Sequence, residues 1–126
     1  MDKFKSTVMA LASSAEVQDS LYPDFVAKGD ELVLDYDEAL NEYDIKLQLN
    51  EDQMVSLSNL EAYLEEHSGS EFEEMYCNSG SLYNDPRWEE IRVLAREFIE
   101  SMGWQYQAPA KNDAVYVNTK NVVKNT

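Results

Sequence analysis

Acidic side chains are concentrated in the middle third of this chain, and their distribution constrains the fold more than any other feature of the sequence. Residues 30–74 hold fifteen Asp or Glu residues and a single base, Lys46, for a net charge of −14. Residues 1–29 contribute −1 and residues 75–126 contribute 0 to the total of −15. Self-repulsion of this size lowers the stability of a compact state, whereas net charge in general raises solubility. Halophilic acidity would spread over the whole surface, so the concentration favours a face that meets something positive over a merely solvated face.

The composition nevertheless predicts a folded chain of one domain, residues 1–126. Apolar residues make up 44% of the sequence and aromatic residues 11%, more than disordered chains carry. A chain of this length buries roughly two-thirds of the surface that its unfolded form exposes. Within the domain we expect the acidic region at 30–74, a neutral C-terminal helix and hairpin at 85–118, and a frayed tail at 119–126.

The compartment is expected to be the cytoplasm. Cys77 is the only cysteine, so no disulfide can form within the chain, and a lone cysteine is typical of cytosolic proteins. The apolar run at residues 8–12 is too short for a secretory signal. No stretch approaches the roughly 20 apolar residues of a transmembrane helix.

Residues 2–21 and 70–76 are predicted to be helical, and both contain the spacing of a capping box. Apolar residues of the first segment recur at spacings of four, three and four, at Phe4, Val8, Leu11 and Ala15. Ser13 and Glu16 have capping-box spacing, so this segment is expected to divide into two shorter helices there. In the second segment a serine is followed three residues later by Glu73.

Two longer helices are predicted at 51–66 and 85–102. The first carries an apolar stripe of Met54, Leu57, Leu60 and Leu64. The second begins with Asp85 as the N-cap and Pro86 at the first helical position, and Gly103 ends it. Its buried face is expected to comprise Trp88, Ile91, Ala95, Phe98 and Met102.

Alternating apolar and polar residues predict two pairs of strands. Residues 31–36 alternate with Leu32, Leu34 and Tyr36 on one side, and residues 44–50 with Ile45, Leu47 and Leu49. No crossover separates them, so they are expected to pair antiparallel. Residues 104–106 and 114–118 predict a second pair. The expected fold class is therefore α+β, a small antiparallel sheet of about four strands packed with about three or four helices.

Catalytic and cofactor signals are weak. His67, the only histidine, and Cys77 could meet as a nucleophilic pair only by chance; a helix C-terminal residue and a small buried apolar residue are the simpler interpretations. The acids at 35–38 and 42–44 lack the glycine and the terminal glutamate of an EF-hand loop. Glycine-rich phosphate loops are absent. We therefore expect no enzyme, no cofactor and no resident metal.

The acidic region is the expected partner-binding site. Ten carboxylates and two tyrosines are its candidate residues: Asp30, Glu31, Asp35, Asp37, Glu38, Glu42, Asp44, Glu61, Glu65, Glu66, Tyr36 and Tyr43. Acids four apart on a helix lie about 6 Å apart along its axis, and acids two apart on a strand about 7 Å. Such an array approximates the row of phosphates of a duplex nucleic acid, in which successive phosphates of one strand are about 3.4 Å apart along the helix axis. The two tyrosines fit a core position as well as an interface.

The sequence therefore favours a small inhibitor that occupies the nucleic-acid-binding surface of a basic protein, such as a nuclease, as counter-defence and nuclease-immunity proteins do. Direct binding to nucleic acid or to a membrane is not expected. Two alternatives stay open. One is an adaptor or homo-oligomeric structural module with incidental acidity, whose interface includes the apolar face of 85–102. The other is a small hydrolase that uses the acids with a metal.

Overall fold

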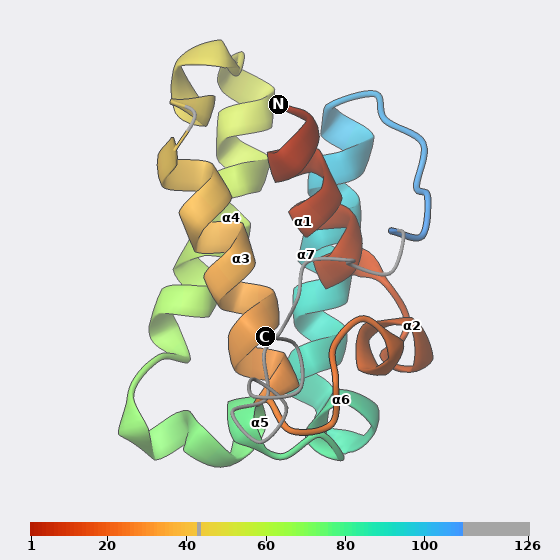
Figure 1. The fold of residues 1–126 in the computed structure, drawn as a ribbon. Helices are drawn as coiled ribbons and strands as arrows, with labels where there is room; N and C mark the ends of the chain where they lie inside the picture. Colours follow the sequence, from red (N-terminus) through yellow and green to blue (C-terminus); the bar gives the residue numbers. More distant parts are fainter. Residues whose placement is uncertain (43, 110–126) are drawn as a thin grey trace, which may run out of the picture.

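The computed structural model describes residues 1–42 and 44–109, and in these residues every regular element is helical (Figure 1). The four long helices are α1 (Asp2–Ala12), α3 (Lys28–Glu42), α4 (Glu51–Glu66) and α7 (Pro86–Ser101). The short elements are α2 (Ala15–Ser20), η1 (Ile45–Gln48), η2 (Ser70–Phe72), α5 (Glu73–Cys77) and α6 (Ser81–Asn84). The predicted α+β fold class with a four-stranded sheet is therefore wrong.

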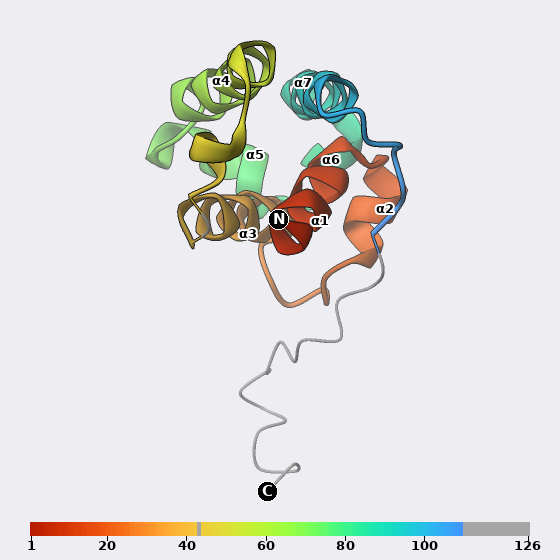
Figure 2. The same ribbon diagram turned by 90° about the horizontal axis from the view of Figure 1, so that it is seen from above.

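The long helices occupy the four corners of a bundle when seen from above (Figure 2). Helix α1 packs against both α3 and α7, and α7 packs against α4. Going around the bundle, the long helices that pack against each other therefore follow the order α3, α1, α7, α4. Helices α3 and α4 face each other across the remaining side of the bundle. There η1 and α5 both pack against α3.

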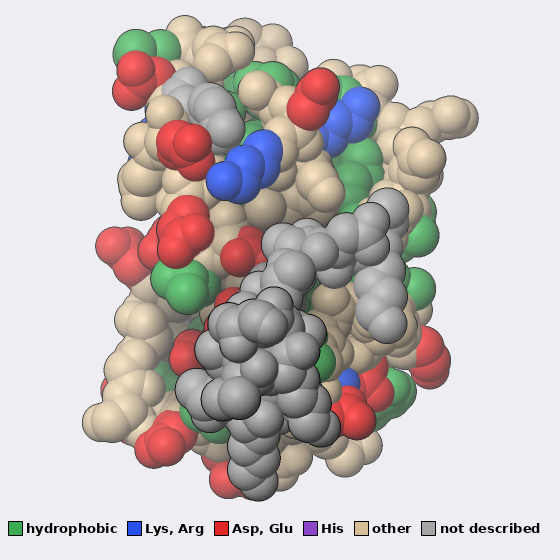
Figure 3. Space-filling model, in the orientation of Figure 1, with side chains coloured by type: hydrophobic (Ala, Val, Ile, Leu, Met, Phe, Trp, Pro, Cys, Tyr) green, Lys and Arg blue, Asp and Glu red, His purple; other side chains and the backbone are tan. Residues whose placement is uncertain are grey.

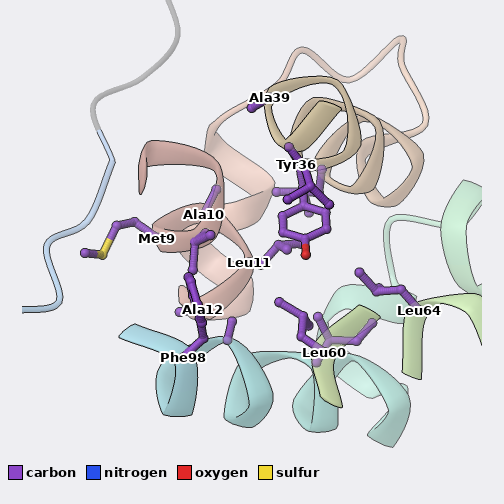
Figure 4. Close-up of a cluster of buried hydrophobic side chains, with 14 of the residues drawn as sticks. Met9, Ala10, Leu11, Ala12, Tyr36, Ala39, Leu60, Leu64 and Phe98 are labelled. Atoms are coloured by element: carbon purple, nitrogen blue, oxygen red, sulfur yellow. The ribbon is translucent and has the colours of Figure 1, made fainter. Parts of the chain in front are cut away.

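Aromatic side chains join the helices in the core. The Phe4 ring of α1 lies 5.8 Å from the Tyr36 ring of α3 and 5.9 Å from the Phe98 ring of α7, measured between ring centroids. Figure 4 shows Tyr36 pointing from α3 toward Leu60 and Leu64 of α4. Burial of each such large apolar side chain stabilises the fold by about 1.5–3 kcal/mol.

Three helix predictions are confirmed: the helices predicted at 51–66 and 85–102, and the division of the opening segment into two helices. Asn50 and Gln53 form a capping box at the start of α4, with both hydrogen bonds 2.9 Å long. The Asp85 carboxylate accepts from the Arg87 backbone N–H at 2.9 Å, with Pro86 in the first turn. The opening segment does divide into two helices, although the capping side chain of α2 is that of Ser14.

The predicted strand at 31–36 is instead part of α3. The six-residue window shows alternation, but the longer pattern of buried residues, Leu32, Tyr36, Ala39 and Leu40, has the spacing of a helix. Leu34, which a strand would have turned inward, is 50% exposed. Contact with α1 fixes the buried side of this helix, so the longer pattern prevails over the short alternation.

The second predicted strand, at 44–50, is also wrong. Its middle residues form the short η1 turn, which buries Ile45 completely but leaves Leu47 86% exposed. Asp44 precedes the turn with a φ of 49°, in the left-handed region, which breaks an extended run. Residues 104–106 form no strand either. The strand predicted at 114–118 and the tail at 119–126 lie outside the described residues.

A candidate binding groove between α3 and α4

The acids of α3 form a stripe along the helix. Glu31, Asp35, Glu38 and Glu42 recur at spacings of four, three and four, which places them on one side of α3. Burial, and then the charges of Asp35, Asp30 and Glu38, raise the pKa of Glu31. These carboxylates therefore lie close enough to repel one another. Figure 3 shows acidic side chains spread over this face of the molecule.

A second group of α3 residues faces α4. Asp30, Val33 and Asp37 are spaced three and four apart and share a side of α3. A matching side of α4 carries residues that are also three or four positions apart: Glu61, Leu64, Glu65 and, just beyond the end of the helix, Ser68. The two sides face each other where packing between neighbouring long helices is sparser than between α1 and α3, α1 and α7, or α4 and α7.

Two adjoining hollows lie between these sides. The first has a volume of about 360 Å³ and is lined by Val33, Tyr36, Asp37, Lys46, Glu61, Leu64, Glu65 and Ser68. The second has a volume of about 470 Å³ and is lined by Asp30, Val33, Leu64, Ser68, Gly69, Ser70, Glu73, Tyr76 and Cys77. Because both are lined by Val33, Leu64 and Ser68, we treat them together as the α3–α4 groove. It has apolar residues from both helices and carboxylates along both edges.

Tyr36 lines the first hollow, and its hydroxyl is buried in the core. Its side chain is 1% exposed, and its hydroxyl has no hydrogen-bond partner among the described residues. Burial, followed by the charges of Glu61 and Asp37, raises the pKa of this hydroxyl well above its usual range. Of the two positions predicted for Tyr36, core or interface, its ring occupies the core.

The remaining predicted site residues are distributed differently. Asp35 accepts a hydrogen bond from the Tyr22 hydroxyl at 2.6 Å, and Glu42 pairs with Lys3 at 3.3 Å. Glu66 is exposed near the end of α4 and lines neither hollow. Asp44 is exposed before η1. Tyr43 lies outside the described residues.

Sequence reasoning missed several groove residues, among them Val33, Lys46, Leu64 and Tyr76. One signal could have found some of them. Had residues 28–42 been interpreted as a helix, the shared side of Asp30, Val33 and Asp37 would have followed from spacing alone. No pattern in the sequence indicates that this side of α3 faces α4.

The surroundings of Cys77 and His67 do not favour a nucleophile. Cys77 is exposed, so its interpretation as a buried apolar residue is wrong. Partial desolvation, followed by the charges of Asp30 and Glu73, raises the pKa of its thiol, which is the reverse of what a reactive thiolate needs. The His67 Nδ1 lies 2.8 Å from the Tyr63 carbonyl oxygen, and the two rings stack at 4.2 Å. Within residues 1–42 and 44–109, no three Asp, Glu, His or Cys side chains converge as metal ligands.

Comparisons with known proteins assign no relative: no family model, curated protein or solved structure matches this chain. Among the helices that the structure describes, none combines the length and the apolar character needed to cross a membrane. The groove is therefore interpreted from its own geometry and charge.

Proposed function

We propose that this protein inhibits a basic, nucleic-acid-binding protein by occupying its nucleic-acid-binding surface with the carboxylates of α3 and α4. The observation that carries the proposal is the acidic stripe of α3 beside the acidic edges of the α3–α4 groove. Residues 30–74 have a net charge of −14, while residues 75–126 are neutral. The net negative charge thus belongs to the segment that contains α3 and α4, where helices hold the carboxylates at fixed spacings.

The spacing of the carboxylates along α3 supports this proposal, although it differs from the spacing expected for a strand. Carboxylates at spacings of four, three and four rise by about 6, 4.5 and 6 Å along α3. Phosphates of a duplex rise by about 3.4 Å per nucleotide on each strand, so the stripe offers a carboxylate for about every one to two phosphates. Association driven by such a field is fast and weakens steeply as salt increases.

The class of partner follows from this chemistry. A nuclease or another nucleic-acid-binding enzyme presents the Lys and Arg residues that the stripe would meet. Counter-defence and nuclease immunity are both roles for an inhibitor of this physical type, and the cytoplasm is the compartment that the lone cysteine favours. In this proposal the protein itself is not an enzyme and binds neither nucleic acid nor a membrane directly.

The alternative of an oligomeric module loses the interface predicted for it. The apolar face of the 85–102 helix is buried in the core, with Trp88, Ile91, Ala95 and Phe98 all fully covered. Among the described residues a few other large apolar side chains are exposed, of which Leu47 on η1 is the most exposed. Exposed apolar residues of this kind are common on monomers.

The test is capture of host proteins by the full chain at about 50 mM and about 500 mM salt, since screening strengthens over that range. The proposal expects a basic nucleic-acid-binding protein that is retained at low salt, released at high salt and displaced by added DNA. The purified partner should then lose its activity when this protein is added in excess.

Two matched triple variants control for total charge. One neutralises exposed acids of α3 and the other neutralises exposed acids of α7: D30N/D37N/E38Q and E90Q/E97Q/E100Q. Capture should fall at least about tenfold for the α3 variant and less than about twofold for the α7 variant. Equal loss in both would show non-specific ionic binding and overturn the proposal, as would salt-insensitive self-association with no basic partner.

A further inference from the structure

A buried lysine binds two carboxylates where the loop after α2 meets the start of α3. Lys28, the first residue of α3, is 3% exposed. Its ammonium donates to the Asp19 carboxylate, to the Asp19 backbone carbonyl oxygen at 2.9 Å and to the Asp24 carboxylate at 2.9 Å. A buried charge is unfavourable unless it is paired and hydrogen-bonded, so these contacts favour one position of the loop.

Each of the two carboxylates has a half-exposed aromatic side chain beside it. Tyr83 of α6 is 49% exposed, and its hydroxyl donates to Asp19 Oδ2 at 2.7 Å. Phe25 is 50% exposed and directly follows Asp24, whose side chain is otherwise open to solvent. Because one ammonium binds both carboxylates, the two aromatic residues lie at one corner of the molecule, which we call the Phe25–Tyr83 corner.

The Phe25–Tyr83 corner continues the acidic stripe of α3. Lys28 precedes Glu31 by three positions, so it lies on the same side of α3, about 4.5 Å before Glu31 along the axis. The loop is also tied to the stripe by the Tyr22 hydroxyl, which donates to Asp35 at 2.6 Å. Figure 2 shows this loop on the side of the bundle away from α4 and α7. The stripe and the corner are therefore neighbouring parts of one surface.

Aromatic rings supply what carboxylates alone lack as substitutes for a nucleic acid. Proteins that bind single strands combine a positively charged groove with flat side chains on which the bases stack. Carboxylates match the charge of that groove, and an aromatic ring presents the flat face that a base would present. Singly exposed apolar residues are common, but here two rings accompany carboxylates that a buried ammonium holds in position. Such preorganisation lowers the entropy lost on binding.

We propose that the Phe25–Tyr83 corner occupies a base-binding site of the basic partner, with the two rings in the positions of bases and the carboxylates of Asp19 and Asp24 in the positions of phosphates. This inference rests on the proposed function and names the contact that gives it specificity. The acidic stripe attracts the partner over a distance, and the corner selects a partner that binds unpaired bases.

The test measures the affinity of the full chain for the purified partner from the capture experiment, at salt concentrations between about 50 and about 300 mM. Phe25→Ala and Tyr83→Ala should each raise Kd at least about tenfold at every salt concentration. Because neither ring is charged, the slope of log Kd against log salt should stay that of the wild type. D30N/D37N/E38Q should instead make this slope shallower.

Two further variants separate stacking from other effects. Tyr106→Ala is the matched control, because Tyr106 is 47% exposed and its hydroxyl is also hydrogen-bonded, to Ser13 at 2.7 Å. It should change Kd less than about twofold. Phe25→Leu keeps an apolar side chain and removes only the flat ring, so it should weaken binding about as much as Phe25→Ala. Circular dichroism identifies any unfolded variant; if Tyr83→Ala unfolds, Phe25→Leu decides, since a phenylalanine side chain makes no hydrogen bond.

The partner's own specificity gives an independent measurement. It should bind a thymidine oligonucleotide more tightly than an abasic strand of the same length, because only the first offers bases to stack. Equal binding of the two strands, or wild-type affinity of Phe25→Leu, would overturn the base-binding assignment.

The outcomes distinguish this inference from the proposed function. If a basic partner is captured and inhibited but Phe25→Ala and Tyr83→Ala bind it as the wild type does, or no worse than Tyr106→Ala, this inference fails and the proposed function stands. If no basic protein is captured at low salt, both fail.

Discussion

The ammonium of Lys46 lies 3.0 Å from the carboxylate of Glu61, and this ion pair joins the η1 turn to α4 at the edge of the α3–α4 groove. Lys46 is the single base among fifteen acids in residues 30–74. The pair thus places the single basic side chain of residues 30–74 at the first hollow of the groove, which Asp37, Glu61 and Glu65 also line.

Replacement of Lys46 by Met should change the free energy of unfolding by no more than about 1 kcal/mol, because both partners of the pair are partly exposed and screened by solvent. Urea denaturation of the two proteins measures this difference. A loss of more than about 2 kcal/mol would give Lys46 a structural role that its exposed ion pair does not explain.

Replacement of Tyr36 by Phe should stabilise the protein by about 1 kcal/mol, because it removes a buried hydroxyl without a partner while the ring keeps its contact with Phe4. Tyr76→Phe is the matched control. The Tyr76 hydroxyl donates to the His67 carbonyl oxygen at 2.5 Å, so its removal should destabilise by about 1 kcal/mol. Opposite signs in thermal or urea denaturation are the expected outcome; a shared sign would mean that Tyr36 has a partner.

Glu31 should make stability decrease as pH rises. Burial and the neighbouring carboxylates raise its pKa in the folded protein above the usual 4.5, so the folded state binds this proton more tightly than the unfolded chain. Its stabilising contribution is present at low pH and is lost as pH rises through the raised folded pKa. Glu31→Gln should therefore be more stable than the wild type at pH 7, with the advantage shrinking toward pH 4.5. A constant difference over this range would contradict the assignment.

Asp85 should show the opposite dependence. Its hydrogen bond from the Arg87 side chain lowers its pKa below the usual 3.8, so its contribution is present above that value and is lost as pH falls through the folded pKa. Asp85→Asn keeps the helix cap but removes the charge, and should lower stability by about 0.5–1 kcal/mol at pH 7. Asp85→Ala also removes the cap and should lower it by about 1–2 kcal/mol.

For Asp85→Asn the difference from the wild type should shrink as pH falls through the lowered folded pKa of Asp85 and vanish once the wild-type carboxyl is protonated in the folded protein. Unfolding midpoints collected from pH 7 to pH 2 give this comparison. If Asn at this position were as stable as Asp at pH 7, the ion pair with Arg87 would contribute nothing to folding.

Local chemistry made α4 and α7 predictable. Both helices begin with a side-chain cap and carry an apolar stripe along much of their length, so each element's own residues specify it. Helix α3 lacks a capping side chain of this kind, and its first residues alternate as a strand would. Its buried side includes Leu32 and Tyr36, and this side becomes evident only over the full helix and in contact with α1.

The sequence by itself determined where the charge lies along the chain, because carboxylates can be counted by segment without knowing the fold. It also determined the helices whose caps and stripes are local. Only the tertiary structure decided which acids meet. Asp37 and Glu61 lie 24 positions apart in the sequence and line one hollow because α1 and α7 hold α3 and α4 facing each other along one side of the bundle. That arrangement depends on packing among distant helices, which no local pattern encodes.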